Sequence, residues 1–449
     1  MKKSRWAALA VAFQVLLVLS VPAAAQEEAI DCSLTSTGLV PIPDLGTESY
    51  QGEQGGLYPG GSNQIPEDHQ ALGLWRAAQI VPRNSAGEPD PDGTIGLLSI
   101  GVSNTRIEFR SFMRQVEGGV DSDVALVNGS QPGEDVSRWQ DIDSLAWTSV
   151  ETILANNGVT AQQVQAVWIK LPDVVNGADQ ILPFPEDAAM YRDQLAVVVR
   201  NAMDRYPNLQ VAYLSSRIYA GYNTNGRPSP EPLAYENGFG VKWLIADQIA
   251  GDMTLNTDER RGPVEAPWLA WGPYLWADGL NARSDGLTWE CGQLQSDGIH
   301  PAPDGAAKVG DLLISHFETE PTATPWFLPD GQPIGEVTLP PVGEVATTTT
   351  TTAPEETTTT TTTTTVADDV TTTTDRLSSS GRPGPPDRSD REEERLARAA
   401  QQESSSDDIG WLIGTVAVLA ALLGAAAAYG YVRRRKGAAE ELISEAPET

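Results

Sequence analysis

The sequence predicts an α/β fold in which a parallel sheet is covered by helices on both faces. Two observations support this prediction. Short apolar runs with the length of buried strands recur between residues 94 and 272, and stretches with helical periodicity lie between them. Strands buried on both faces read as continuous apolar runs, and their alternation with helices is typical of parallel sheets.

The first strand is expected at residues 94–101 (TIGLLSIG), an apolar run that ends at a glycine. In folds of this kind, sites form outside the carboxyl ends of the strands. The residues directly after each run are therefore the candidates for chemistry. The other four runs are residues 123–130, 164–172, 209–216 and 266–272.

Three long segments between and after these runs show helical patterns. Residues 185–207 begin with proline and acidic residues, which suit a helix N-terminus. Residues 235–252 are expected to be helical despite their glycines. Residues 303–317 place apolar side chains near one face, which predicts an amphipathic helix after the last strand.

The two ends of the 449-residue chain are not expected to fold with this domain. Residues 1–25 combine basic residues, an apolar run and an alanine-rich end, which is the pattern of a cleaved secretory signal peptide; an uncleaved anchor is the alternative. Residues 336–408 are rich in threonine and lack apolar periodicity, which predicts a disordered stalk. The folded domain is therefore expected at residues 26–335.

A membrane anchor is expected near the C-terminus. Residues 409–432 are apolar and uncharged over a length that can cross a bilayer as a helix, which takes about 20 residues. The basic start of residues 433–449 predicts a cytoplasmic tail. We therefore expect a single-pass protein of a cell membrane, bacterial in type, with its N-terminal domain outside the cell.

The exported part contains both cysteines, Cys32 and Cys291. An oxidising compartment permits a disulfide between them, and two unpaired buried thiols are the alternative. The chain has 61 acidic and 30 basic residues, a net charge of −31, which disfavours binding to nucleic acid. The three histidines are dispersed and no Cys-x-x-Cys is present, so neither a metal nor a cofactor is expected.

Ser103 directly follows the first expected strand, where a side chain is exposed at the edge of the sheet. A serine hydroxyl becomes a good nucleophile only when a base takes its proton, and histidine is the usual base. The base needs a partner that fixes its tautomer. Asp297 and His300 fit these roles, because a turn at Gly298 can bring the carboxylate against one ring nitrogen while the other faces the serine.

These motifs resemble those of the SGNH, or GDSL-type, hydrolases over about residues 90–320. That family has a flavodoxin-like three-layer α/β/α fold. The resemblance implies that Ser103 is the nucleophile, His300 the base and Asp297 its partner. It also implies that the backbone N–H groups of Ser103 and of Gly129, the glycine after the second strand, stabilise the oxyanion.

Two positions depart from the pattern of the family. Val102 replaces the aspartate of the first motif, and Pro172 falls where an asparagine is expected to donate to the oxyanion. The loss of such a donor can cost about 2.7–4 kcal/mol of transition-state stabilisation. Lys170 or Asn128 could supply a replacement.

Ordinary structural roles are the alternatives for these residues. Ser103 could cap the helix that follows it, and Asp297 and Gly298 could form an ordinary turn. Gly129 could be a glycine that a turn requires and nothing more. Four tryptophans near the histidine motif could stack on sugars or pack in the core, namely Trp268, Trp271, Trp276 and Trp289.

The combined prediction is a serine ester hydrolase anchored at the cell surface that acts on extracellular esters, for instance acylated glycans. Its expected partners are an ester substrate and the membrane, through the C-terminal helix. The two departures from the family favour the alternative, a surface module on the same fold that binds without catalysis.

Overall fold

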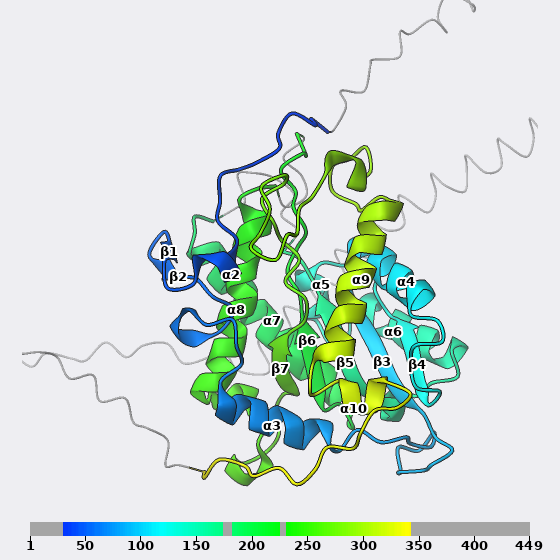
Figure 1. The fold of residues 1–449 in the computed structure, drawn as a ribbon. Coiled ribbons are helices and arrows are strands. Elements are labelled where there is room, and N and C mark those ends of the chain that lie inside the picture. Colours follow the sequence, from blue (N-terminus) through cyan, green and yellow to red (C-terminus); the bar gives the residue numbers. More distant parts are fainter. Residues whose placement is uncertain (1–29, 174–181, 225–229, 343–449) are drawn as a thin grey trace, which may run out of the picture. The chain divides into compact units, whose positions relative to one another are not determined.

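A five-stranded parallel sheet forms the centre of the fold (Figure 1). The strand order is β4-β3-β5-β6-β7, and each neighbouring pair is parallel. All five apolar runs therefore form strands, which confirms the predicted α/β fold. The strands are β3 (Ile95–Gly101), β4 (Val124–Asn128), β5 (Val164–Lys170), β6 (Val211–Leu214) and β7 (Trp268–Trp271).

The computed structural model describes residues 30–173, 182–224 and 230–342. The expected signal peptide, membrane helix and cytoplasmic tail, and the expected stalk beyond residue 342, lie outside these ranges. Within them, no helix combines the length and the apolar character that crossing a membrane requires. The first residues of the expected stalk lie on the domain, where the Arg260 guanidinium donates a 3.0 Å hydrogen bond to the Pro340 carbonyl.

Helices cover both faces of the sheet and complete three layers. The pair α4 (Ser103–Gln115) and α9 (Pro303–Thr319) lies side by side, and so does the pair α7 (Glu186–Arg205) and α8 (Leu233–Ala250) (Figure 1). The three long helices expected from the sequence are thus present. The shorter elements are α2 (Ile42–Leu45), α3 (Glu67–Ala77), α5 (Val136–Trp139), α6 (Leu145–Asn156), α10 (Thr324–Phe327) and the hairpin of β1 (Ser49–Tyr50) and β2 (Glu53–Gln54).

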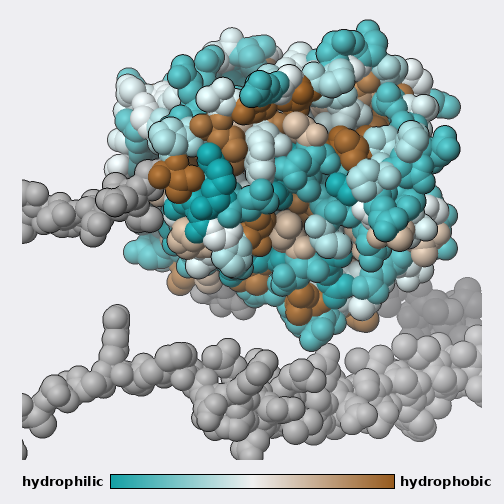
Figure 2. Space-filling view, turned by 90° about the horizontal axis from the view of Figure 1, so that it is seen from below, coloured by the Kyte–Doolittle hydropathy of each residue, from teal (hydrophilic) through white to brown (hydrophobic). Residues whose placement is uncertain are grey.

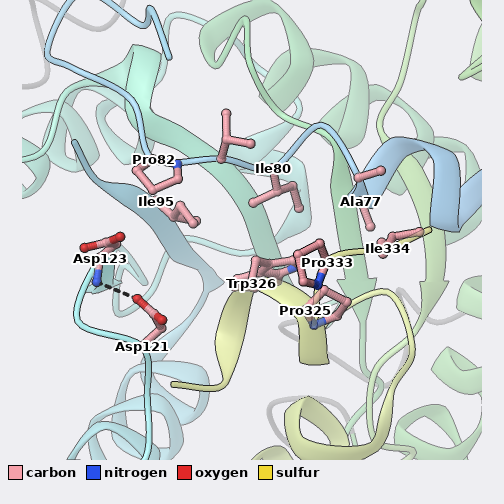
Figure 3. A pocket seen from close by; sticks show the side chains of 12 residues that line it. Ala77, Ile80, Pro82, Ile95, Asp121, Asp123, Pro325, Trp326, Pro333 and Ile334 are labelled. Atoms are coloured by element: carbon pink, nitrogen blue, oxygen red, sulfur yellow. Dashed lines mark hydrogen bonds between the residues drawn. The ribbon is translucent and has the colours of Figure 1, made fainter. Parts of the chain in front are cut away.

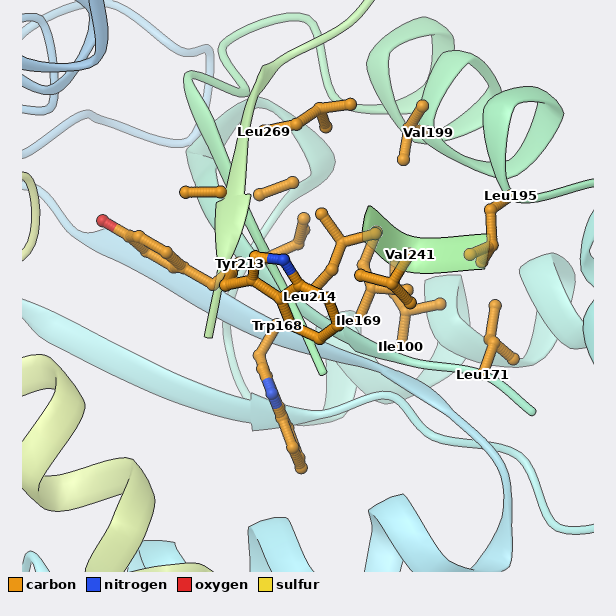
Figure 4. Close-up of a cluster of buried hydrophobic side chains, with 14 of the residues drawn as sticks. Ile100, Trp168, Ile169, Leu171, Leu195, Val199, Tyr213, Leu214, Val241 and Leu269 are labelled. Carbon is orange, nitrogen blue, oxygen red and sulfur yellow. The ribbon is translucent and has the colours of Figure 1, made fainter. Parts of the chain in front are cut away.

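Alternation along the strands sends side chains into both helical layers (Figure 4). Trp168 of β5 is fully buried and stacks on Phe109 of α4, with ring centroids 5.8 Å apart. Successive residues of a strand point to opposite faces, so Ile169 points to the other layer. Figure 4 shows Val199 of α7 and Val241 of α8 on that side. The core is therefore continuous through the sheet.

The tryptophans near the histidine motif belong to the core. All four are at most 4% exposed, so none of them can offer a face to a sugar ring. Buried tryptophans usually find an acceptor for the indole N–H. Here Trp268 donates to His69 O, Trp271 to Leu57 O, Trp276 to the Glu231 carboxylate and Trp289 to Leu275 O.

The two cysteines form a disulfide across the domain. Cys32 and Cys291 lie with their Cα atoms 5.4 Å apart and are separated by 259 residues of sequence. The bond fixes the N-terminal segment beside the short helix that precedes the histidine motif. A structural disulfide of this kind is typical of proteins in an oxidising, extracellular compartment.

Candidate active site

Ser103 is the first residue of α4 and follows β3 after a single residue, Val102. The N-cap residue is Val102, which is extended and has no polar side chain; its backbone N–H donates to the Thr105 hydroxyl at 3.3 Å. Ser103 therefore does not serve as the cap. The sheet and the helix approach closely here, because a Cβ atom on Gly101 would lie 2.3 Å from the Thr105 hydroxyl and 2.5 Å from the Lys170 carbonyl. Glycine lets the strand end against the first helical turn.

A continuous chain of hydrogen bonds joins the three predicted catalytic residues. Ser103 Oγ lies 2.7 Å from Nε2 of His300, and Nδ1 of that ring lies 2.6 Å from Oδ2 of Asp297. An ionised carboxylate only accepts, so Nδ1 carries the proton and Nε2 is left to accept from the serine hydroxyl. Residues 197 positions apart in the sequence thus meet at the carboxyl edge of the sheet.

The surroundings of Asp297 favour its ionised form. Burial acts to raise its pKa, but hydrogen bonds from the His300 ring and from the backbone N–H groups of His300 and Ile299 outweigh burial and lower the pKa below 3.8. The two N–H groups reach Oδ1 at 3.0 and 2.9 Å. Gly298, with φ of +66°, permits the turn. The turn expected as an alternative is present, and it aims the second carboxylate oxygen at the ring.

Contacts outside these three residues hold the histidine loop against α4. Asn104, buried in the first turn of α4, donates from Nδ2 to the Ile299 carbonyl at 2.9 Å. The backbone N–H of Gln295 donates to the His300 carbonyl at 2.8 Å. The only signal for Asn104 in the sequence is its place directly after the serine, and sequence reasoning missed it.

Backbone N–H groups are the available donors for an oxyanion. The Ser103 N–H lies at the start of α4, where a helix has no internal acceptor and carries the positive end of its dipole. Gly129 follows β4 and is buried, and a Cβ atom there would lie 2.8 Å from the Ser99 carbonyl. This close packing is one reason for a glycine here; Gly129 is not among the described residues that line the pocket beside Ser103, and the role of its N–H as an oxyanion donor stays a prediction.

Side chains that could replace the missing donor already have partners. Lys170 is 2% exposed, and its Nζ contacts the two carboxylate oxygens of Glu108 at 2.5 and 2.6 Å. Nδ2 of Asn128 donates to the Arg106 carbonyl at 2.9 Å. Pro172 has neither a backbone N–H nor a polar side chain. The candidate oxyanion site thus depends on backbone donors.

A pocket of about 440 Å³ opens beside the serine and the histidine. Its volume lies in the usual range for small-molecule sites, roughly 300–1,000 Å³. Two arginines of α4 in its wall were missed by sequence reasoning, although they lie three and seven residues after the serine and so share its face of the helix. The lining residues are Ser103, Arg106, Ile107, Arg110, Pro132, Gln295, Asp297 and His300.

A second pocket, of about 250 Å³, lies near the amino ends of the strands (Figure 3). Ile95 at the start of β3 and Asp123 just before β4 line it together with Trp326. The Asp123 N–H donates to the Asp121 carboxylate at 2.9 Å, and no described lining residue is a serine, threonine, cysteine, lysine or histidine. The molecular surface on the side of α3 and α10 shows hydrophobic residues in separate groups among hydrophilic ones (Figure 2). The pocket at the carboxyl ends of the strands, which contains Ser103 and His300, is therefore the better candidate for nucleophilic chemistry.

The two remaining histidines have structural surroundings. His69 is 6% exposed, hydrogen-bonds the Leu269 carbonyl through Nε2 at 2.8 Å and stacks on Trp268. Burial lowers its pKa to about 4, so the ring is neutral at pH 7. His316 packs edge-on against Tyr213, and burial lowers its pKa to about 4 as well. In the described ranges, no three acidic, histidine or cysteine side chains are grouped to hold a metal ion.

Comparisons with known proteins find likeness in structure alone. No protein-family model and no curated protein matches the chain. It is similar to a lipase from a goat rumen metagenome (13% identity, TM-score 0.28, 50% of this chain and 97% of that chain). It is also similar to a carbohydrate esterase family 2 enzyme with a carbohydrate binding domain from Corynascus thermopiles (Myceliophthora fergusii) (11%, 0.29, 51% and 67%) and to a GDSL-like lipase from Parabacteroides merdae (11%, 0.26, 53% and 97%).

Identities and TM-scores this low carry no argument about activity. The chemistry therefore has to be inferred from the side chains of this chain.

Proposed function

We propose that this protein is a serine ester hydrolase with Ser103 as the nucleophile, His300 as the general base and Asp297 as the residue that orients the base. The observation that carries the proposal is the unbroken pair of hydrogen bonds, 2.7 and 2.6 Å long, that ends on a serine in the wall of a pocket. A hydroxyl bonded to a neutral imidazole, itself bonded to an ionised carboxylate, is the arrangement that activates serine in acyl transfer.

Acylation follows from these contacts. His300 takes the Ser103 proton at Nε2 while Oγ bonds to the ester carbonyl carbon, and the carbonyl oxygen becomes an oxyanion. The Ser103 N–H at the positive end of α4 donates to this oxygen, and Asp297 stabilises the imidazolium. When the tetrahedral intermediate collapses, the C–O bond breaks, the alcohol leaves with the proton from His300, and the acyl group stays on the serine.

Deacylation reverses the proton path with water. His300 takes a proton from a water molecule, the resulting oxygen nucleophile attacks the acyl carbon, and the second tetrahedral intermediate forms at the same donors. Its collapse returns the proton to Ser103 and releases the carboxylic acid.

Hydrolysis of 4-nitrophenyl acetate by the full-length chain in detergent tests the proposal. We expect Ser103→Ala and His300→Ala each to lose at least about a thousandfold in kcat, as triad deletions do. Ser315→Ala, an exposed serine of α9, is the matched control and should keep the wild-type rate. A fluorophosphonate should label Ser103 in the wild type. Equal rates in all four proteins, together with no labelling, would reject the hydrolase.

A binding module without catalysis is the second candidate, and one observation favours it. The position of the expected side-chain donor is Pro172, and both Lys170 and Asn128 are engaged elsewhere. The oxyanion would therefore form with backbone donors alone. If the folded protein is not labelled by the fluorophosphonate, the result would favour this candidate.

We also propose that the domain works outside the cell and is held at a membrane by residues 409–432. The disulfide between Cys32 and Cys291 supports an oxidising location. The apolar and uncharged run, followed by a basic cluster, supports the anchor. Protease treatment of intact cells should release the domain, whereas a domain that resists until the cells are lysed would contradict this orientation.

A further inference from the structure

We propose that the natural ester carries a negatively charged group, a carboxylate or a phosphate, that Arg106 and Arg110 bind beside the nucleophile. This inference rests on the proposed hydrolase function and specifies its substrate class. Its basis is the position, pairing and surroundings of these two arginines.

Both arginines lie on the same wall of the pocket as the serine. They are three and seven residues after Ser103 on α4, so their Cα atoms lie about 4.5 and 10.5 Å further along the helix axis. Helical side chains lean toward the N-terminus of their helix, which brings both guanidinium groups back toward the serine. Arg106 is half-buried, Arg110 is exposed, and both line the same pocket.

Neither guanidinium is neutralised by the protein. Among the described residues, no carboxylate lies within 4.0 Å of Arg106 or Arg110. The one acidic residue that lines the pocket, Asp297, is already bonded to the His300 ring and to two backbone N–H groups. Arginine stays charged at any physiological pH. The pocket therefore presents two positive charges without an internal partner.

The overall charge of the protein is opposite in sign to that of these two arginines. The chain has 61 acidic and 30 basic residues, so the protein as a whole repels anions. Elsewhere in the described residues, Arg192, Arg205 and Arg283 are paired with carboxylates. Other arginines, such as the exposed Arg114, also lack a carboxylate partner, so it is the position of Arg106 and Arg110 in the pocket wall that sets them apart. A local positive site in such a protein selects an anionic group through hydrogen bonds to charged atoms, for which the forked guanidinium is well suited.

The same pocket does not suit a long acyl chain. Of the described residues that line it, only Ile107 and Pro132 are purely apolar. A fatty acyl group would need a longer apolar surface to bury its methylene groups. The geometry thus points to a short acyl group on a polar, anionic alcohol, or to a short acyl group that is itself charged.

A pair of acetyl esters that differ in one negative charge and one methyl group tests the inference on the full-length protein. The probes are 4-acetoxybenzoate and its neutral methyl ester, with 4-acetoxyphenyl phosphate to separate phosphate from carboxylate recognition. The measured quantity is the ratio of kcat/KM for the charged ester to that for the neutral ester. Binding of the same probes to Ser103→Ala, which does not turn them over, is measured by calorimetry.

We expect the wild type to prefer the charged ester by about tenfold, the usual order of a hydrogen bond to a charged group. Arg106→Ala and Arg110→Ala should each reduce the ratio, and the double variant should bring it to about one. Arg114→Ala is the matched control, because Arg114 is exposed, lies one turn further along α4 and does not line the pocket. This variant should leave the ratio unchanged.

The outcomes separate this inference from the proposed hydrolase. If turnover requires Ser103 but the double variant has the same kcat/KM ratio as the wild type, the anionic substrate is overturned and the hydrolase remains. A second outcome is no turnover and no labelling, together with tighter binding of 4-acetoxybenzoate than of its methyl ester and loss of this preference in the double variant. That result overturns the hydrolase and leaves the anion site. Equal binding of charged and neutral probes to Ser103→Ala overturns the inference.

Discussion

The buried ion pair between Lys170 and Glu108 allows a quantitative prediction about stability. Lys170 ends β5, Glu108 lies on α4, and the two side chains are 3% and 0% exposed. Replacing the lysine by methionine keeps most of the side-chain volume and removes the charge. The carboxylate of Glu108 then stays buried without its partner.

The expected loss follows from this burial. Removing one partner of a buried pair usually costs about 3–5 kcal/mol of unfolding free energy, because the remaining charge is left uncompensated in a low dielectric. For a domain of this size, about 2 °C in Tm corresponds to each kcal/mol, so we expect Tm to fall by about 6–10 °C. The backbone carbonyl of Lys170, which accepts a 2.6 Å hydrogen bond from the Thr105 hydroxyl, is kept in this variant.

Thermal unfolding of the full-length protein, followed by circular dichroism, measures the effect. The double variant Lys170→Met/Glu108→Leu removes both charges and should recover most of the lost stability, since hydrophobic pairs of similar volume often replace buried ion pairs without loss. Arg192→Met removes the solvent-accessible pairs with Asp193 and Asp247 and should cost less than about 1 kcal/mol. A single Lys170 variant as stable as Arg192→Met, or a double variant no better than the single one, would refute the reasoning.

Three further predictions concern the triad, the pH dependence and the disulfide. Asp297→Asn should keep the fold and lower kcat by about 10⁴, because the amide favours the wrong His300 tautomer; a kcat within tenfold of wild type in the 4-nitrophenyl acetate assay would contradict this role. His69 has a folded-state pKa of about 4 against 6.5 for the ordinary side chain, because it is buried. As the pH falls, the unfolded chain therefore protonates His69 before the folded chain does. The unfolding free energy is unaffected above pH 6.5 and falls by about 3 kcal/mol toward pH 4. In denaturant titrations, the unfolding free energy of His69→Gln should depend less on pH than that of the wild type. Reduction of the Cys32–Cys291 bond, which closes 259 residues, should lower the unfolding free energy by as much as about 5 kcal/mol, and an unchanged denaturation midpoint in dithiothreitol would argue against a stabilising role.

The glycines of helix α8 are explained by tertiary contacts and not by the local sequence. Its glycines count against a helix by propensity, yet the apolar periodicity predicted one correctly. At Gly240 a Cβ atom would lie 2.4 Å from the Tyr191 ring of α7. The glycine is therefore explained by the close approach of two helices, which the sequence alone does not reveal.

The strands and the Asp-x-x-His turn were accessible from the sequence because their causes are local. Burial on both faces leaves apolar runs such as residues 94–101. The contact between Asp297 and His300 spans three residues, so a turn at Gly298 suffices to bring the two side chains together.

Tertiary structure alone decided which charged residues of α4 face the protein and which face the pocket. Glu108 lies between Arg106 and Arg110 in the sequence, and all three residues are equally polar. Glu108 is buried because β5 places Lys170, 62 residues away, against its side of the helix. Among the described residues the two arginines have no carboxylate partner, because Asp297, the acidic residue that the histidine loop brings to their pocket, is bonded within its own loop. The order of strands in the sheet sets these distant contacts, and no pattern within α4 encodes that order.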